Sequence, residues 1–237
     1  MTSKKEQQSE EDALIKRNNQ APGFPASLVR SRLQLLIERF IQYANFDLQE
    51  YIKAQRILKV DISIPTLKEW YPGPNWKKDI DKAIRYFMKI EGKADANGNF
   101  DYFSLFSRAK LDNSGLHLNV DPEVLELYII RAGNFNTELD YNVTKLFKCA
   151  YTHEMYWEML KHDYPKFDYR FFLTPEEINN KFKTKYQNSN ITTQIIEPSE
   201  REIRAIYDAG LSPRYITVTE RRDVIGRCKK IIGCEFC

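Results

Sequence analysis

Thr174-Pro175-Glu176-Glu177-Ile178 opens the stretch that decides the fold, which continues NNKFKTKYQNSNITTQIIEPSEREIRAIYDAGLSPRYITVTERRDVIGRCKKIIGCEFC to residue 237. Its first residues predict a capped helix. The Thr174 hydroxyl can accept a free backbone N–H, Glu177 can reach back, and proline suits the first turn. Ile178, Phe182 and Tyr186 then recur every four residues as one apolar stripe. We expect an amphipathic helix here, followed by a polar turn over residues 186–190.

A second helix follows this turn, and its sequence is compatible with two starting points. Ser199 and Glu202 form another capping pattern, whereas a start near Thr192 keeps the apolar residues at helical spacing. The earlier start requires Pro198 to occupy a first-turn position or to kink the helix. Gly210 is a typical helix stop.

After Pro213 the hydrophobic period changes to two, which predicts a β-hairpin. The apolar positions that share a parity are Ile216 and Val218 on the first strand, and Ile232, Cys234 and Phe236 on the second. Residues 220–230 are the expected tip. Two helices followed by a hairpin is the order of a winged helix, for which DNA binding is the default hypothesis.

The formal charge of the chain is concentrated in this hairpin. From residue 214 onward, three acidic residues (Glu220, Asp223, Glu235) stand against six basic ones, Arg214, Arg221, Arg222, Arg227, Lys229 and Lys230. The resulting +3 equals the formal net charge of the whole chain. A charged hairpin can also be a solvated edge that blocks aggregation, but its place behind two helices favours contact with DNA.

The first two-thirds of the chain indicate a second unit of similar style. A helix over residues 27–44 is followed by an alternating strand over 58–64, and a turn at 112–115 leads into another strand over 116–120. Further helices are expected after Thr66, from Trp76 to Met88, and over residues 123–133, 139–149 and 152–162.

We therefore predict an α+β fold made of two tandem winged-helix domains, mainly helical, with small antiparallel β-hairpin wings. The expected organisation is a disordered N-terminal tail over residues 1–26, an N-terminal winged-helix domain over 27–163 and a C-terminal winged-helix domain over 166–237. The boundary is placed where a polar stretch contains the helix-breaking Pro165.

Composition narrows the class of protein. With 237 residues, 42% hydrophobic and 13% aromatic, the chain has ample material for a core. No run of about 18 apolar residues indicates a membrane span, and the polar N-terminus does not resemble a signal peptide. We expect a cytoplasmic protein with reduced cysteines. Cys234 and Cys237 have opposite strand parity, so we expect neither a metal site nor a cofactor.

No catalytic motif is complete. His153-Glu154 begins like a zinc-protease helix, but Trp157 stands where the second histidine would be needed. His117 is followed by no second histidine of the kind that metal-dependent nickases use. Neither a glycine-rich phosphate loop nor a Ser-His-Asp pattern is recognisable along the chain. We therefore expect a binding protein and not an enzyme.

Three short segments resemble the theta-type plasmid replication initiators, the iteron-binding Rep proteins with tandem winged-helix domains. Cys149-Ala150-Tyr151-Thr152-His153-Glu154-Met155-Tyr156-Trp157-Glu158-Met159-Leu160 is similar to the helix that closes the family's first domain. Leu173-Thr174-Pro175-Glu176-Glu177-Ile178, with Ile195 to Ile203, resembles its recognition segment, and Ile231 to Phe236 its last strand. The resemblance covers residues 28–236.

The resemblance implies binding to direct repeats (iterons) in the double-stranded DNA of a replication origin. It also implies a first domain that touches the DNA backbone and forms a homodimer, repression of the protein's own gene, and host partners such as a helicase or a DnaA-like initiator. The sequence departs from the family at Glu154, where an arginine is usual, and at Thr192 to Gln194, where basic residues are usual. Glu197 and Glu200 add negative charge.

Ten residues are our candidates for DNA contact. We expect Lys181, Lys185, Arg221, Arg222, Arg227 and Lys229 to hold phosphates. We expect Thr192, Thr193, Gln194 and Arg201 to face base edges, because amide and guanidinium groups can form bidentate bonds to bases. The alternatives are a winged-helix transcriptional regulator without a replication role, a metal-dependent nickase, and a protein-binding module whose hairpin serves solubility.

Overall fold

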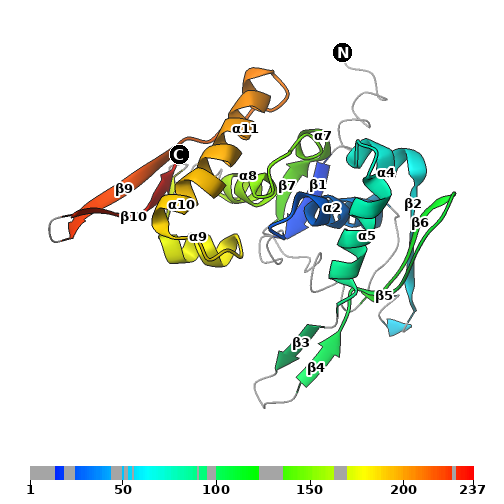
Figure 1. Ribbon diagram of the computed structural model, residues 1–237. Coiled ribbons are helices and arrows are strands. Elements are labelled where there is room, and N and C mark those ends of the chain that lie inside the picture. Colours follow the sequence, from blue (N-terminus) through cyan, green and yellow to red (C-terminus); the bar gives the residue numbers. More distant parts are fainter. Residues whose placement is uncertain are drawn as a thin grey trace. The chain divides into compact units, whose positions relative to one another are not determined.

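The computed structural model describes residues 14–18, 25–43, 50, 53–54, 56–89, 91–94, 100–122, 136–162, 170–225 and 228–237. It combines helices with small antiparallel sheets, which confirms the predicted α+β class (Figure 1). The chain divides into two compact units, one built mainly from Thr137–Cys237 and the other mainly from Arg32–Asn136. No helix in the described part of the chain is long and apolar enough to span a membrane.

The N-terminal elements begin earlier than expected. Leu14–Asn18 forms strand β1, although we placed these residues in a disordered tail. The apolar pair Leu14-Ile15 ends the polar run at this point, and such residues favour a strand over a solvated coil. Helix α2, Leu28–Tyr43, confirms the first predicted helix. The remaining tail before Pro25, and the helix expected at 123–133, lie outside the described residues.

The Arg32–Asn136 unit is built on a three-stranded antiparallel sheet in the order β2-β6-β5. Its strands are β2 (Leu58–Ser63), β5 (Phe106–Leu111) and β6 (Gly115–Val120). In β2, buried and exposed residues alternate strictly, as the period of two predicted. Helix α4, Ile64–Trp70, packs on β2 and β6. It is capped by Ser63 and not by Thr66, because Pro65 occupies its first turn.

The other elements of this unit follow from simple local signals. Helix α5, Trp76–Phe87, buries one face through Ile80, Ala83, Ile84 and Phe87. The Phe87 ring lies 5.8 Å from the Phe106 ring, measured between centroids, which joins the helix to the sheet. Strands β3 (Glu91–Ala94) and β4 (Phe100–Phe103) form a separate hairpin.

The C-terminal unit begins with strand β7, Asn136–Asp140, and helix α7, Tyr141–Thr144. We expected a helix over 139–149. The carboxylate of Asp140 accepts the N–H of Asn142 at 2.7 Å, so the helix begins only after this cap. Helix α8, Thr152–Lys161, confirms the next prediction, and its residues from Thr152 to Glu158 are all buried.

Helix α9, Pro175–Lys181, has the predicted capping box, with Thr174 and Glu177 in reciprocal bonds. It packs on a three-stranded sheet in the order β8-β10-β9, made of β8 (Phe171–Leu173), β9 (Val218–Ile225) and β10 (Cys228–Phe236). Figure 1 shows the β9–β10 hairpin extending beyond the helices of this unit. The predicted hairpin is confirmed, although the residues assigned to its tip belong largely to its two strands.

The hairpin contains a bulge, which explains why its second strand departs from a strict period of two. Ile231 lies opposite Arg222 and Gly233 opposite Arg221, so Ile232 is an extra residue. A Cβ atom on Gly233 would lie 2.2 Å from Phe172 Cζ and 2.6 Å from the Leu173 carbonyl oxygen. Glycine therefore allows β8 to approach the bulge.

The second helix begins at Asn188, earlier than either predicted start. Its segments are α10 (Asn188–Ile191), a π-helical turn η2 (Thr192–Ile196) and α11 (Glu197–Asp208). In the π turn the Glu197 N–H donates to the Thr192 carbonyl, five residues back. A proline in a regular α-helix clashes with the carbonyl four residues earlier. The wider turn just before Pro198 relieves that conflict, and the helix continues.

Glu202 joins this helix to α8. Its carboxylate accepts the backbone N–H groups of Lys148 and Cys149, at 2.5 and 3.1 Å, and the Thr152 hydroxyl at 2.6 Å. The N-cap residue of α8, Tyr151, makes no side-chain cap bond, so Glu202 supplies the negative charge that a helix N-terminus favours. We expected Ser199 and Glu202 to cap their own helix. Ser199 is instead fully buried inside it.

The bonds of Glu202 join α8 to α11, and both α7 and α8 belong to the compact unit of Thr137–Cys237. The sequence instead favoured a domain boundary after α8. The expected linker at 163–166 lies outside the described residues, and the boundary between functional domains stays a prediction.

Replacing Glu202 with glutamine should destabilise the C-terminal unit by about 2 kcal/mol, because an amide accepts fewer and weaker bonds than a carboxylate and leaves partly buried donors unsatisfied. Urea unfolding, followed by the fluorescence of buried Trp157, measures the change. Glu197→Gln on the same helix is the control and should change stability by less than about 0.5 kcal/mol. Equal effects of the two substitutions would contradict the capping role.

Candidate nucleic-acid interface

The helix from Asn188 to Asp208 has one polar, exposed face. Five exposed polar residues recur at i, i+3, i+4, i+7 and i+11, and are Asn190, Thr193, Gln194, Glu197 and Arg201. Asn188, Ser189, Ala205 and Asp208, at the two ends of the helix, are exposed as well. The buried residues are Ile191, Ile195, Ile196, Ser199, Ile203 and Ile206. We call the five central exposed residues the reading stripe, because such spacings place side chains on one side of a helix. Three of the four predicted base-reading residues, Thr193, Gln194 and Arg201, lie on it.

Thr192, the fourth of these residues, lies against the hairpin instead. Its hydroxyl donates to the carboxylate of Glu220 on β9. Arg222 donates to the same carboxylate at 2.5 and 3.0 Å. The Thr192 bond, with help from Arg222, lowers the pKa of Glu220. Thr192 therefore links the helix to the hairpin, and Glu220 is a positioning residue that the charge count did not reveal.

The two arginines of the hairpin are exposed and ion-paired. Arg221 pairs with Glu235 on the neighbouring strand and Arg222 with Glu220, and both arginine side chains are 54% exposed. Surface ion pairs of this kind contribute about 0–1 kcal/mol, so a phosphate can replace the carboxylate at little cost. Both side chains are thus accessible to DNA, and their role stays a prediction.

The remaining predicted contacts of the hairpin are less defined. Lys229 lies on β10 opposite Val224. Arg227 lies outside the described residues. Cys234 is buried and Cys237 exposed, as their opposite parity predicted. Burial raises the pKa of Cys234 to about 11, which keeps this thiol protonated.

Lys181 lies in a different environment from the one we expected. Its ammonium is 2.7 Å from the Glu158 carboxylate, a side chain only 3% exposed. Lys161 pairs with the same carboxylate, and burial lowers the pKa of Lys181. A buried carboxylate needs such partners. Lys181 is therefore explained by its ion pair, and we leave it out of the surface proposed below.

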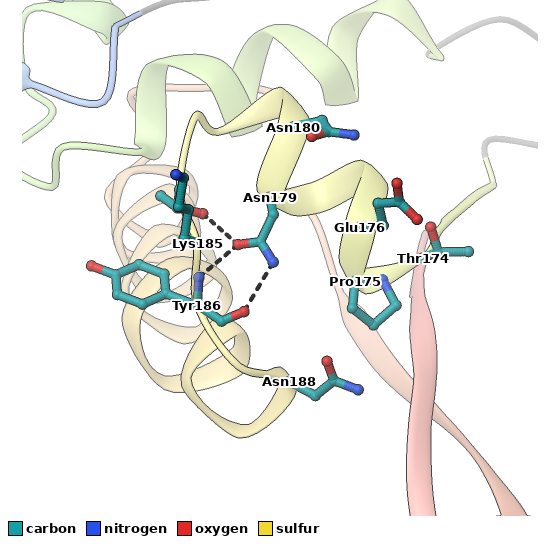
Figure 2. A pocket seen from close by; sticks show the side chains of 9 residues that line it. Thr174, Pro175, Glu176, Asn179, Asn180, Lys185, Tyr186 and Asn188 are labelled. Atoms are coloured by element: carbon teal, nitrogen blue, oxygen red, sulfur yellow. Dashed lines mark hydrogen bonds between the residues drawn. The ribbon is translucent and has the colours of Figure 1, made fainter.

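Lys185 is exposed on an open pocket beside the turn that joins α9 to α10. Figure 2 shows that Asn179 organises this turn. Its side-chain oxygen accepts the Tyr186 N–H at 2.9 Å and the Thr184 hydroxyl at 2.7 Å, and its amide donates to the Tyr186 carbonyl at 2.9 Å. Asparagine is a typical turn former, but its position inside a predicted helix concealed this role.

A second polar cluster surrounds His117 in the Arg32–Asn136 unit. His117 Nδ1 lies 2.5 Å from Asp61 Oδ1, and Nε2 lies 2.9 Å from Ser114 Oγ and 3.3 Å from Asp112 Oδ1. The sequence did not reveal this Ser-His-Asp arrangement, because Asp61 comes from a distant strand. Ser114 also donates to Asp112 at 2.5 Å, and Asp61 is largely exposed. The arrangement therefore holds a β-turn and lacks the enclosure that a nucleophile needs.

The His117 cluster should make stability depend on pH. The bond to Asp61 is the largest cause that raises the pKa of His117. This contribution is fully present below the unfolded pKa, near 6.5, and is lost as pH rises through the folded value. The melting temperature of the wild type should therefore fall between about pH 5.5 and about pH 8.5, and we expect this fall to be smaller in His117→Gln.

His162 should change the pH dependence of stability in the opposite direction, and it serves as the comparison. Burial lowers its pKa, so its contribution grows as pH rises. We expect His162→Gln to steepen the loss of stability with rising pH, whereas His117→Gln flattens it. Parallel shifts in the two variants would rule out the assignment.

Among the described residues no group of three or more His, Cys, Asp or Glu side chains could hold a metal ion. Comparisons of the sequence with protein-family models and with curated proteins give no match. The fold, however, is similar to that in the crystal structure of the Pi initiator protein in complex with iteron DNA, with a TM-score of 0.65. The match covers 95% of this chain and 96% of that chain at 15% sequence identity. The chain therefore shares its overall fold with that initiator, as the resemblance predicted, and the assignment of two tandem winged-helix domains stays a prediction.

Proposed function

We propose that this chain is a replication initiator that binds direct repeats in the double-stranded DNA of an origin through two winged-helix domains. One observation supports this most strongly. The reading stripe and the arginine-bearing hairpin are held together by the Thr192–Glu220 bond, in a chain whose fold matches an iteron-binding initiator over nearly its whole length.

The proposed mechanism assigns different contacts to the two elements. Gln194 and Arg201 on the reading stripe contact base edges in the major groove, since both side chains can bind bases in a bidentate manner. Arg221, Arg222, Lys185, Lys229 and Arg227 contact phosphates, which gives affinity without sequence preference. Thr192 takes a positioning role in this scheme, and Thr193 lies beside the base contacts.

The hairpin arginines exchange partners when DNA binds. In the free protein Arg221 and Arg222 are neutralised by Glu235 and Glu220. A phosphate therefore competes with a carboxylate on the same strand pair, so each contact yields less affinity than a free arginine would. The Thr192 bond retains Glu220 when Arg222 leaves it, which keeps the helix and the hairpin in register.

The domain roles are part of the proposal. The C-terminal winged-helix domain, over residues 166–237, reads the repeat, and the N-terminal one, over 27–163, contacts the DNA backbone and forms a homodimer. Dimers repress the protein's own gene, and the chain recruits a host helicase or a DnaA-like initiator in the cytoplasm.

Arg221→Ala with Arg222→Ala should weaken binding to all sequences alike. The slope of log affinity against log salt should fall by up to about 2, since each phosphate contact contributes about 0.9. Fluorescence anisotropy on repeat-containing and scrambled duplexes over a salt series measures both quantities. Arg85→Ala, which removes an exposed arginine paired with Asp81 elsewhere, is the control and should leave the slope unchanged. An unchanged slope in the double variant would refute the hairpin assignment.

Gln194→Ala and Arg201→Ala should each reduce the preference for the repeat over scrambled DNA, by about 1–3 kcal/mol per lost base contact. Their salt slope should stay near that of the wild type. Maintenance of a plasmid that carries the gene and its flanking repeats then tests the initiator role. Specific binding without plasmid maintenance would indicate a regulator instead.

A further inference from the structure

One acidic residue of the reading stripe has no structural task. The first turns of α11 carry three glutamates. Glu200 accepts the Val218 N–H at 3.2 Å, and Glu202 caps α8. Glu197 is exposed and makes no hydrogen bond or ion pair with another described side chain. A carboxylate repels phosphates, so on a DNA-binding face it carries a cost unless it contacts something other than the backbone.

We propose that Glu197 is a specificity-determining residue that selects a cytosine in the recognised DNA. The inference rests on the proposed function and deepens it by naming a base. Glu197 occupies the centre of the reading stripe, four residues after Thr193, three after Gln194 and four before Arg201. Glu197 and Arg201 both lie in α11 at a spacing that makes side chains neighbours on a helix surface, and Thr193 and Gln194 are exposed on the π turn that directly precedes them. A helix that brings Gln194 and Arg201 to base edges therefore brings Glu197 to the same groove.

The chemistry of a carboxylate limits what it can bind there. Ionised glutamate only accepts hydrogen bonds. In the major groove, cytosine presents an N4 amino donor, whereas guanine presents the acceptors N7 and O6 and thymine the acceptor O4. Adenine offers the N6 donor but places the N7 acceptor beside it. Cytosine is the one base whose edge attracts a carboxylate without a neighbouring acceptor that repels it.

The backbone around Glu197 keeps the side chain in this position. Its N–H closes the π turn on the Thr192 carbonyl, and the ring of the following residue, Pro198, fixes the φ angle at that position. Thr192 is itself held by Glu220. The location of Glu197 on the stripe is thus set by the same bonds that join the helix to the hairpin, and both elements would dock as one body.

The test is selection from a duplex library with a randomised block of about 20 base pairs, using the full chain as wild type, Glu197→Gln and Glu197→Ala. Wild type should enrich cytosine at one position. Glu197→Ala should lose that preference by about tenfold. Glu197→Gln should change it to adenine, which a glutamine amide binds at N6 and N7. Both variants should bind non-specific DNA more tightly, because a negative charge is lost.

Asp208→Asn is the matched control. It removes one exposed negative charge from the same helix, three turns further on, and should raise non-specific affinity without changing any base preference. If wild type selects a sequence and the Glu197 variants select the same one, the cytosine assignment is wrong while the proposed function stands. If wild type selects no sequence at all, the proposed function fails and this inference with it. Circular dichroism spectra confirm that the variants are folded.

Discussion

The C-terminal unit depends on one carboxylate. Glu202 accepts two backbone N–H groups from the residues just before α8 and the hydroxyl of its first residue, and so anchors α11 to the buried helix α8. Without this bond, the N-terminus of α8 would leave donors unsatisfied in a partly buried place, which is more costly than the loss of an ordinary surface bond.

Local signals predicted the elements, and long-range bonds decided their roles. The capping box at Thr174, the alternation in β2 and the hairpin at the end of the chain all depend on residues close in sequence. The assignment of Lys181 to DNA and of Ser199 to a cap did not account for partners far along the chain. Glu158 lies 23 positions before Lys181, and the cluster around His117 joins residues 56 positions apart. The hydrophobic periodicity of a single sequence does not predict contacts between residues that are so far apart along the chain.

Ion pairs within the chain mask part of its positive charge. In the hairpin, each described arginine has a glutamate on the same or the adjacent strand. Among the helices, Lys181 and Lys161 both pair with the carboxylate of Glu158. A surface of this kind attracts nucleic acid weakly at long range. The proposed function therefore assigns sequence preference to close contacts.

The π turn divides the long helix into two parts whose rotation about the axis is set separately. One residue changes the direction of the downstream face by about 100°. Buried Ile203 and Ile206 fix the orientation of the second part, and Ile191 fixes that of the first. A deletion of one residue within Thr192–Ile196 would leave both parts helical, yet it would turn one of them away from the core. The additional residue of the π turn therefore sets the rotation of the first part of the helix relative to the second. The direction in which the start of the helix faces can change while the second part, which Glu202 anchors, stays in place.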